Sequence, residues 1–255
     1  MAETEVAISQ AQLAEILSSV TPGAVLVGGQ ALAFWVTNYE VALPKALVGA
    51  ISDDADFLGS RDDVLAIASA VRGTPTFASP AVITALVGQV KIPVSASEFV
   101  NVDVLHRLVG VESGKVRDHA AEVTWNDVTF HVMHPLDVLQ SRIENLAKLA
   151  EKQNEQGIEQ ARLAVQVAGR YIAEIARYPD DGQKHALRLI EQVVWIAKSS
   201  AGRRAAREYA VAFGDAIPLY AIESESFTVR RWPRMVKELE TAAGLRKPDR
   251  GGMSL

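Results

Sequence analysis

The chain contains no cysteine among its 255 residues, which excludes a disulfide framework, a cysteine-ligated zinc site and a cysteine nucleophile. Long apolar runs are also missing. The longest, residues 24–36, is interrupted by two glycines and a glutamine and is too short to cross a bilayer. The N-terminus carries Glu3 and Glu5 where a secretory signal would carry basic residues. These features predict a cytoplasmic protein with no membrane partner.

The composition is that of a globular protein, since 49% of the residues are hydrophobic and 22% are charged. The charges are unevenly distributed. Residues 1–135 hold 7 Lys and Arg against 15 Asp and Glu, whereas residues 136–255 hold 19 against 16. An acidic front half is typical of a metal site. A basic back half fits either a polyanionic partner or ordinary helix-surface charge.

Short apolar runs alternate with helical patterns in the front half, and this alternation predicts an α+β or α/β sheet domain over residues 1–134. A hairpin is expected across a turn at Asn126–Asp127. The expected helices cover residues 5–20, 30–39 and 61–71, and the expected strands cover residues 24–27, 55–58, 83–94, 99–105, 122–125 and 128–133.

The pattern changes at Pro135, which is suited to a first helical position, with Asp137 in the first turn. From there the sequence predicts a helical domain of four or five helices over residues 135–246, followed by a disordered tail at residues 247–255. The expected breaks between helices fall at Gly157, at residues 179–182, near Gly202, at residues 214–218 and before Pro233.

Gly28 and Gly29 separate the expected strand at residues 24–27 from the helix that follows. The N-terminus of a helix presents backbone N–H groups and partial positive charge, which suit a phosphate. Glycines also let a ligand approach the backbone closely. A simple turn between a strand and a helix is the alternative interpretation.

Asp54 and Asp56 stand two residues apart at the expected strand of residues 55–58, so both are expected on one face of it. Neighbouring carboxylates repel each other unless a cation lies between them. Hard oxygen ligands of this kind suit Mg²⁺ or Mn²⁺. The alternative is an exposed acidic loop at residues 52–54.

Asp103 lies in a run that otherwise reads as a buried strand, between Val102 and Val104. A buried carboxylate needs a partner, which is either a metal ion or a basic side chain. A strand with one solvated face is the alternative.

Together these segments form an ordered pattern that resembles the nucleotidyltransferase fold of the DNA polymerase β superfamily. The resemblance is to its minimal bacterial members and to abortive-infection nucleotidyltransferase toxins, and it covers about residues 20–175. It rests on Gly-Gly-Gln-Ala at residues 28–31 followed by Trp35, on Ser-x-Asp-x-Asp-Phe at residues 52–57, and on His-Pro-Leu-x-x-Leu-x-Ser-Arg at residues 134–142.

The resemblance implies a nucleotidyltransferase-type mixed sheet with flanking helices, followed by a helical bundle. It implies an enzyme that uses Mg²⁺ or Mn²⁺ and a nucleoside triphosphate such as ATP as the donor. The acceptor would be RNA (tRNA above all), a protein or a small molecule, and an antitoxin-like protein would be a further partner. The implied metal-binding and catalytic residues are Asp54, Asp56 and Asp103, and the implied triphosphate contacts are Gly28, Gly29, Gln30 and Ser52.

One position departs from the pattern of this group. The residue before the Asp-x-Asp pair is commonly basic there, whereas this chain has Asp53. This departure motivates a second hypothesis, in which a catalytically inactive module of the same fold binds a nucleotide, a nucleic acid or a protein. A third hypothesis is a helical interaction protein, in which the three aspartates would lie apart.

Three further features each have two interpretations. Arg142 falls at the edge of the apolar arc of its helix, where it would contact phosphate or form a structural ion pair. His131 and His134 have a spacing that fits either metal ligands or a coincidence at a strand end. The third feature is a set of C-terminal arginines that fits an RNA-contacting surface or an ordinary bundle exterior: Arg203, Arg204, Arg207, Arg230, Arg231 and Arg234.

Overall fold

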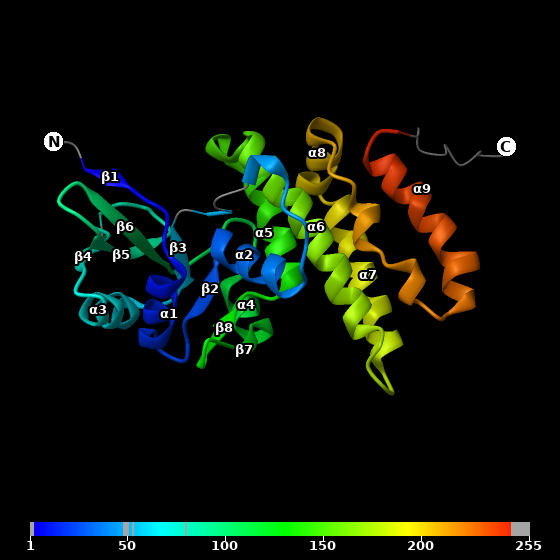
Figure 1. Cartoon of the computed structure of the whole chain (residues 1–255). Helices are drawn as coiled ribbons and strands as arrows, with labels where there is room; N and C mark the ends of the chain where they lie inside the picture. Colours follow the sequence, from blue (N-terminus) through cyan, green and yellow to red (C-terminus); the bar gives the residue numbers. More distant parts are fainter. Residues whose placement is uncertain (1–2, 48–50, 53, 80, 246–255) are drawn as a thin grey trace. The chain divides into compact units, whose positions relative to one another are not determined.

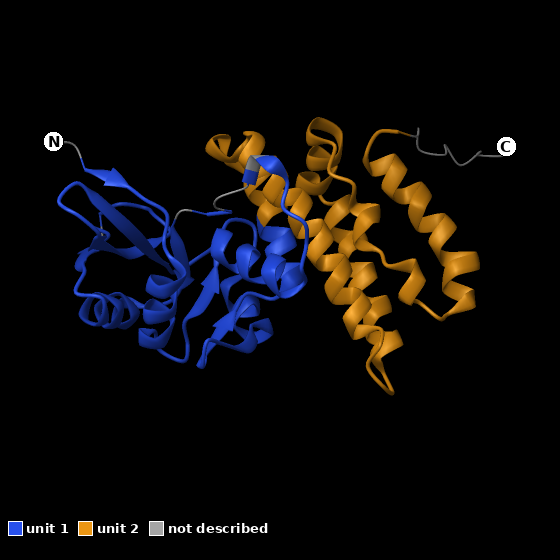
Figure 2. Cartoon of the chain, in the orientation of Figure 1, with its two compact units in different colours: residues 1–141 blue, residues 142–255 orange. Residues whose placement is uncertain are grey.

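A computed structural model of the chain describes residues 3–47, 51–52, 54–79 and 81–245. The chain forms two compact units, residues 1–141 and residues 142–255 (Figure 2). The expected domain boundary at residue 135 is the start of helix α5 (Pro135–Lys148), and the two units divide within that helix. The expected disordered tail at residues 247–255 lies outside the described residues.

Within the described residues, eight strands of the first unit form one mixed sheet (Figure 1). The strand order is β4-β5-β6-β3-β2-β8-β7, and β1 pairs in parallel with the start of β6. The pairs β6–β3 and β2–β8 are parallel, while β2–β3 and β7–β8 are antiparallel. The strands are β1 (Thr4–Glu5), β2 (Val25–Val27), β3 (Ala55–Leu58), β4 (Thr74–Phe77), β5 (Leu86–Pro93), β6 (Glu98–Leu105), β7 (Ala121–Trp125) and β8 (Val128–Val132).

Helices of the first unit pack on this sheet. α1 contacts α3 and β8, α2 contacts β2 and β3, and α3 contacts β4, β5 and β6. Their apolar sides supply much of the core, which includes the fully buried Ile16, Leu32 and Ile67. The helices of this unit before α5 are α1 (Gln10–Ser19), α2 (Gly28–Asn38), the short 3₁₀ turn η1 (Lys45–Leu47), α3 (Arg61–Ala70) and α4 (Ser113–His119).

Strand β6 alternates between a buried and a half-buried face. Val100, Val102 and Val104 are fully buried, whereas Asn101 and Asp103 lie on the opposite, partly accessible side. This is the alternation predicted from the sequence, because successive strand residues point to opposite faces. At this strand the sheet therefore holds the core on one face and carries polar groups on the opposite face.

The second unit consists of helices. α6 packs against α7, and α7 also contacts α8 and α9. Its core includes the fully buried Ile172, Ile190 and Val193. The elements after α5 are η2 (Ala150–Lys152), α6 (Glu155–Ile175), α7 (Gly182–Lys198), α8 (Ser200–Tyr209), η3 (Phe213–Ala216), η4 (Leu219–Ala221), the π-helical segment η5 (Phe227–Arg231) and α9 (Trp232–Ala242).

Two glycines expected at breaks between helices lie instead in the first turns of helices. Asn154 caps α6 by accepting a hydrogen bond from the backbone N–H of Gly157, and Ser199 caps α8 in the same way at Gly202. A Cβ atom on Gly157 would lie 1.9 Å from the Lys152 carbonyl oxygen, and one on Gly202 would lie 2.0 Å from the Ile196 carbonyl oxygen. Both glycines are therefore needed for close approach of the preceding segment.

Other expected boundaries were also wrong. The first helix starts at Gln10 instead of residue 5, because Ser9 and Gln12 form a capping box there and residues 4–5 pair with β6. The break expected before Pro233 is absent from the described residues 225–242, where helical backbone is continuous. Pro233 lies in the first turn of α9, directly after the π-helical segment of residues 227–231.

Asp63 is a buried carboxylate that joins two segments of the first unit. Its side chain accepts hydrogen bonds from Thr21 N (3.0 Å), Ser60 N (2.8 Å) and Ser60 Oγ (2.9 Å). Burial alone would raise the pKa of Asp63, but these hydrogen bonds outweigh it and lower the pKa below its ordinary value. We expect Asp63→Ala to lower the free energy of unfolding by about 3 kcal/mol, because two partly buried N–H groups lose their acceptor.

Chemical denaturation followed by circular dichroism measures this loss, and Asp62→Ala is the control because Asp62 is exposed in the same helical turn. An acid whose pKa is lowered by folding stabilises the fold above its ordinary pKa and loses that effect as the pH falls. The difference between wild type and Asp63→Ala should therefore shrink below the ordinary value of 3.8. Equal stability of the two variants at neutral pH would contradict this assignment.

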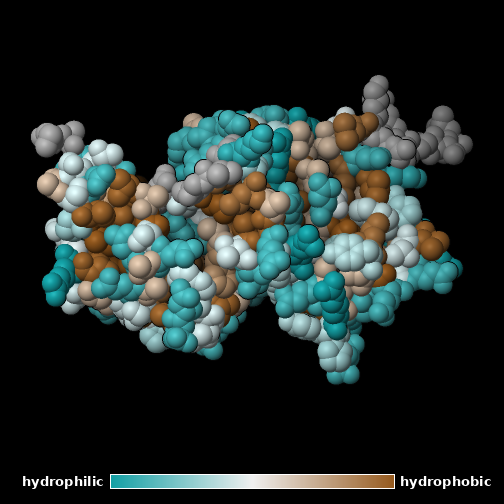
Figure 3. Space-filling model, in the orientation of Figure 1, coloured by the Kyte–Doolittle hydropathy of each residue, from teal (hydrophilic) through white to brown (hydrophobic). Residues whose placement is uncertain are grey.

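Hydrophilic and hydrophobic residues are mixed on the visible face of each unit (Figure 3). Large exposed apolar side chains include Ile83 in the first unit and Trp195 in the second. Among the described residues, no helix is both long enough and apolar enough to cross a membrane.

Candidate functional site

The N-terminus of α2 lies at the end of β2, and it is the feature around which the candidate site is built. The helix begins at Gly28 directly after Val27, and Val27 provides no side-chain hydrogen bond to cap it. Gly28 has a φ of +67°, a conformation that favours glycine. The backbone N–H groups of this first turn are therefore the kind of group that binds an anion at a helix N-terminus.

Two acidic or polar side chains press directly against these glycines. A Cβ atom on Gly28 would lie 2.0 Å from Asp56 Oδ2, and a Cβ atom on Gly29 would lie 2.4 Å from Ser52 Oγ. Only glycine leaves room for these side chains at the start of α2. The structure thus brings together the Gly-Gly segment and the Ser-x-Asp-x-Asp segment that the sequence singled out.

Strand pairing places Asp103 beside Asp56. Asp56 pairs with Asp103 in the parallel ladder between β3 and β6, and it also pairs with Val27 in the antiparallel ladder between β3 and β2. Residues paired in register on adjacent strands point to the same face, with strands about 4.8 Å apart. The two carboxylates are therefore neighbours on the partly accessible face of the sheet.

Asp54 precedes β3 by one residue and completes what we call the acidic cluster, Asp54, Asp56 and Asp103. Ser52 Oγ donates a hydrogen bond to Asp54 Oδ1 at 2.8 Å. The side-chain Nε2 of Gln30 donates to the Ser52 carbonyl oxygen at 3.0 Å. Gln30 and Ser52 thus tie the first turn of α2 to the loop that carries Asp54.

The environment of Asp103 disfavours its negative charge. Burial raises the pKa of Asp103 above its ordinary value, the hydrogen bond from Gln89 opposes that rise, and the charges of Asp54 and Glu5 add to it. Gln89 Nε2 donates to Asp103 Oδ1 at 2.7 Å from the paired position on β5. The repulsion from Asp54 also indicates that these two carboxylates are close enough to interact.

Among the described residues, no group of three or more histidine, aspartate or glutamate side chains is arranged to hold a metal ion by itself. Mg²⁺ commonly takes one or two protein carboxylates and completes its coordination with substrate phosphates and water. The hard oxygen donors and the mutual repulsion within the acidic cluster fit this partial ligand set. Asp53, the position that departs from the family pattern, lies outside the described residues.

Arg142 belongs to the second unit, and its guanidinium is buried there. Arg142 Nη1 donates to Gln160 Oε1 at 3.3 Å, so a structural role within the helices accounts for part of its bonding. A contact from Arg142 to phosphate stays a prediction.

Several C-terminal arginines also bond within the second unit. Arg204 pairs with Glu208 at 2.7 Å, Arg231 pairs with Glu191, and Arg207 Nε donates to the Ala242 carbonyl oxygen at 3.0 Å. These contacts are those of a bundle exterior, and a contact from the same arginines to RNA stays a prediction.

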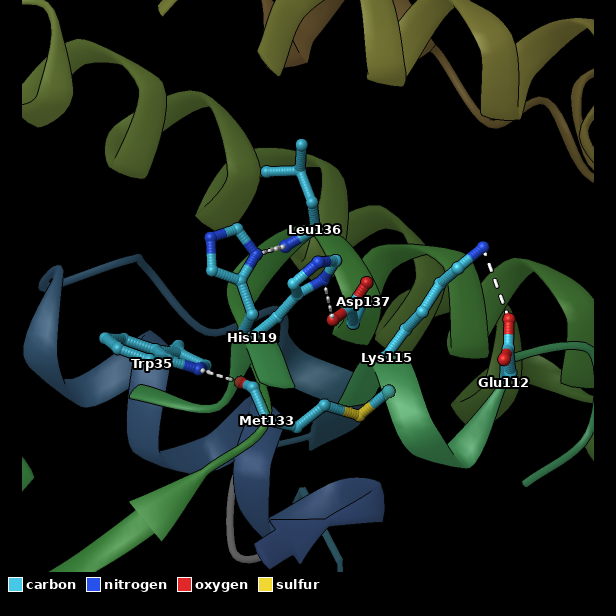
Figure 4. Close-up of polar contacts among 8 residues, drawn as sticks. Trp35, Glu112, Lys115, His119, Met133, Leu136 and Asp137 are labelled. Carbon is cyan, nitrogen blue, oxygen red and sulfur yellow. Dashed lines mark hydrogen bonds and ion pairs between the residues drawn. The ribbon is translucent and has the colours of Figure 1, made fainter. Parts of the chain in front are cut away.

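A second polar group, which sequence reasoning missed, consists of His119, His134 and Asp137, of which His119 and Asp137 are labelled in Figure 4. His119 Nδ1 lies 3.2 Å from Asp137 Oδ2, and the two imidazole rings are 6.2 Å apart. Burial raises the pKa of Asp137, while the charges of His119 and Lys115 oppose that rise. The sequence indicates Asp137 only as a helix-start residue, and no local signal links it to His119 on α4.

Trp35 links α2 to the segment that follows β8. Its indole Nε1 donates to the Met133 carbonyl oxygen at 2.8 Å, and both residues are buried (Figure 4). Because Met133 N donates to the Leu26 carbonyl oxygen at 2.9 Å, the ends of β2 and β8 are held side by side. The aromatic residue of the sequence pattern therefore positions α2 on the sheet.

Comparison with known proteins finds no protein-family model that matches this sequence and no curated protein with significant similarity to it.

Proposed function

We propose that this protein is a divalent-metal-dependent nucleotidyltransferase, which moves a nucleoside monophosphate from a nucleoside triphosphate to a hydroxyl acceptor and releases pyrophosphate. The observation that carries the proposal is the meeting of the acidic cluster with the glycine N-terminus of α2. The acidic cluster supplies negative oxygen ligands, and the N-terminus of α2 supplies backbone N–H groups for phosphate.

The residues have distinct roles in this proposal. The N–H groups of Gly28 and Gly29 bind the triphosphate, and the Gln30–Ser52 bond holds the loop that positions Asp54. Asp54 and Asp56 would hold Mg²⁺ or Mn²⁺ through their carboxylate oxygens. The metal, when bound, neutralises charge on the phosphates and lowers the barrier to attack on the α-phosphorus.

Asp103 is the proposed base. The acceptor oxygen forms a bond to the α-phosphorus, the bond from that phosphorus to the bridging oxygen breaks, and the electron pair leaves with pyrophosphate. The hydroxyl proton passes to Asp103. A carboxylate whose pKa is raised by burial is a better proton acceptor than an ordinary one, and Gln89 fixes its orientation.

The direct test incubates the full chain with Mg²⁺, each α-³²P-labelled nucleoside triphosphate, and total tRNA or cell lysate. We expect label on an acceptor and release of pyrophosphate. Asp54→Ala and Asp56→Ala should each lower the rate at least about 100-fold, because charge neutralisation at the phosphates contributes most of the catalysis. Transfer that survives both substitutions would exclude this mechanism.

Asp118→Asn is the matched control, since Asp118 is an exposed carboxylate on α4. The assay also tests the second candidate function, a nucleotide-binding module without catalysis. That candidate is motivated by Asp53, which stands where proteins of the resembling group commonly have a basic residue. Triphosphate binding that does not depend on Mg²⁺, without pyrophosphate release, would support the module.

A further inference from the structure

The first unit contains a cleft lined by residues of α1, α2 and the β7–β8 hairpin. Its volume is about 220 Å³. Small-molecule sites for drug-sized ligands usually measure about 300–1,000 Å³, so this cleft suits a single ring system. The side chains that shape it include Leu13, Gln30, Phe34, Asn38, Trp125 and Phe130.

Aromatic rings form much of its wall. Phe34 from α2 meets Phe130 from β8 edge to face, with ring centroids 5.7 Å apart. Trp125, at the end of β7, lines the same cleft and is half-buried. Flat aromatic side chains bind planar ligands by stacking, and every nucleobase presents such a face.

Gln30 supplies a polar group of fixed orientation. Its side chain is only 9% exposed, and its Nε2 is held by the Ser52 carbonyl oxygen at 3.0 Å. That bond fixes the orientation of the amide group and leaves Oε1 as a hydrogen-bond acceptor. No donor to Oε1 is present among the described residues. Because Gln30 lines the cleft, its amide oxygen is able to accept a hydrogen bond from a ligand there.

We infer that this cleft binds a nucleobase, whose ring packs against Trp125 and Phe34 and whose N–H edge donates to Gln30 Oε1. The apolar wall favours burial of a flat ring, and the single fixed acceptor selects a ring that carries an N–H group. The inference goes beyond the transfer reaction, because the cleft binds its ligand whether or not transfer takes place.

Gln30 also connects the cleft to the acidic cluster. The Gln30 amide holds the Ser52 backbone, and Ser52 Oγ holds Asp54 Oδ1 at 2.8 Å. A base that bonds Gln30 therefore stabilises the orientation of the loop that carries Asp54. The base comes either from the donor nucleotide itself or from a separate nucleoside, and both sources present the same chemistry to Gln30.

Calorimetric titration of the full chain with adenosine, guanosine, cytidine and uridine tests the inference. Ala33 lines the cleft, and Ala33→Leu places a larger side chain inside it. We expect at least one nucleoside to bind and Ala33→Leu to weaken that binding at least tenfold. Ala70→Leu, at the exposed end of α3, should bind as wild type does. The inference is overturned if no nucleoside binds at millimolar concentration, or if Ala33→Leu binds as tightly as wild type.

Further titrations separate this cleft from the proposed transferase site. Tripolyphosphate with Mg²⁺ probes the phosphate site alone, and Ala33→Leu should bind it as wild type does. Loss of tripolyphosphate binding in Ala33→Leu would mean that the substitution acts on folding, and it would overturn the assignment of the cleft.

Competition between a nucleoside triphosphate and the nucleoside identifies the source of the base. If the triphosphate displaces the nucleoside, the cleft binds the donor's own base, whereas independent binding of the two identifies a separate ligand. Nucleoside binding without label transfer would count against the transferase alone.

Discussion

Gly28→Ala should lower the rate of the proposed nucleotidyl transfer about 100-fold and lower the free energy of unfolding by about 3 kcal/mol. Two physical costs add together. A non-glycine residue in the left-handed region costs about 1–2 kcal/mol, and Gly28 has a φ of +67°. The new Cβ would also lie 2.0 Å from Asp56 Oδ2, 2.8 Å from its Cγ and 2.9 Å from its Cβ. The Asp56 side chain must therefore move, and a displacement of about 1 Å in a catalytic group costs on the order of 100-fold in rate.

Thermal unfolding and the labelled-transfer assay measure the two effects separately. Gly23→Ala is the matched control, because a Cβ there has no neighbour within 4 Å and the residue precedes the same strand. The double variant Gly28→Ala/Asp56→Ala removes most of the steric overlap. Its loss of stability should be smaller than the sum of the two single losses. Wild-type stability and activity in Gly28→Ala would show that the turn can adopt another conformation.

The sequence predicted the elements around the acidic cluster best, because each has a local signal. The strand at residues 55–58 was predicted with the bounds that β3 has. The hairpin turn was recognised from Asn126 and Asp127, which both have positive φ, as a two-residue turn of this kind requires. Proline at position 135 marked the start of α5. Alternation, turn chemistry and proline act within a few residues, so a single sequence reveals them.

Features that depend on distant partners were not predicted. Strand β4 is exposed and contains Pro75, so it lacks the pattern of a buried strand and exists because it pairs with β5 at the sheet edge. Gln89 was not singled out, although its bond to Asp103 depends only on the register between β5 and β6. The sequence could identify the carboxylates, but strand order alone decides that Asp103 lies beside Asp56.

Asp103→Asn should abolish the proposed transfer activity and yet stabilise the protein in the absence of ligands. Burial, Asp54 and Glu5 all disfavour the ionised carboxyl, and a neutral amide of the same shape removes that repulsion. Gln89 Nε2 can still donate to Oδ1 of the asparagine, so the hydrogen bond is kept. Because Asp103 is only half-buried and solvent screens its charge, the expected gain is about 1 kcal/mol.

The pH dependence of this gain has a definite sign. An acid whose pKa is raised by folding stabilises the fold while it is protonated, and that contribution is lost as the pH rises through its folded pKa. Near pH 3, below the ordinary value of 3.8, wild type and Asp103→Asn should unfold at similar denaturant concentrations. The advantage of the variant should appear as the pH rises to 7. Asp118→Asn, at an exposed position, should show no such trend.

Ligand binding should reverse the order of stability. A ligand at 100 times its Kd stabilises the native state by about 2.7 kcal/mol, so Mg²⁺ with a non-hydrolysable triphosphate should raise the melting temperature of wild type. Asp103→Asn lacks one of the negative groups that favour the cation, so its melting temperature should rise less. Wild type would then be the less stable protein without ligand and the more stable one with it. If Asp103→Asn has the higher melting temperature both without and with the ligand, the charge of Asp103 is balanced without a metal. This carboxylate then has no part in binding the metal.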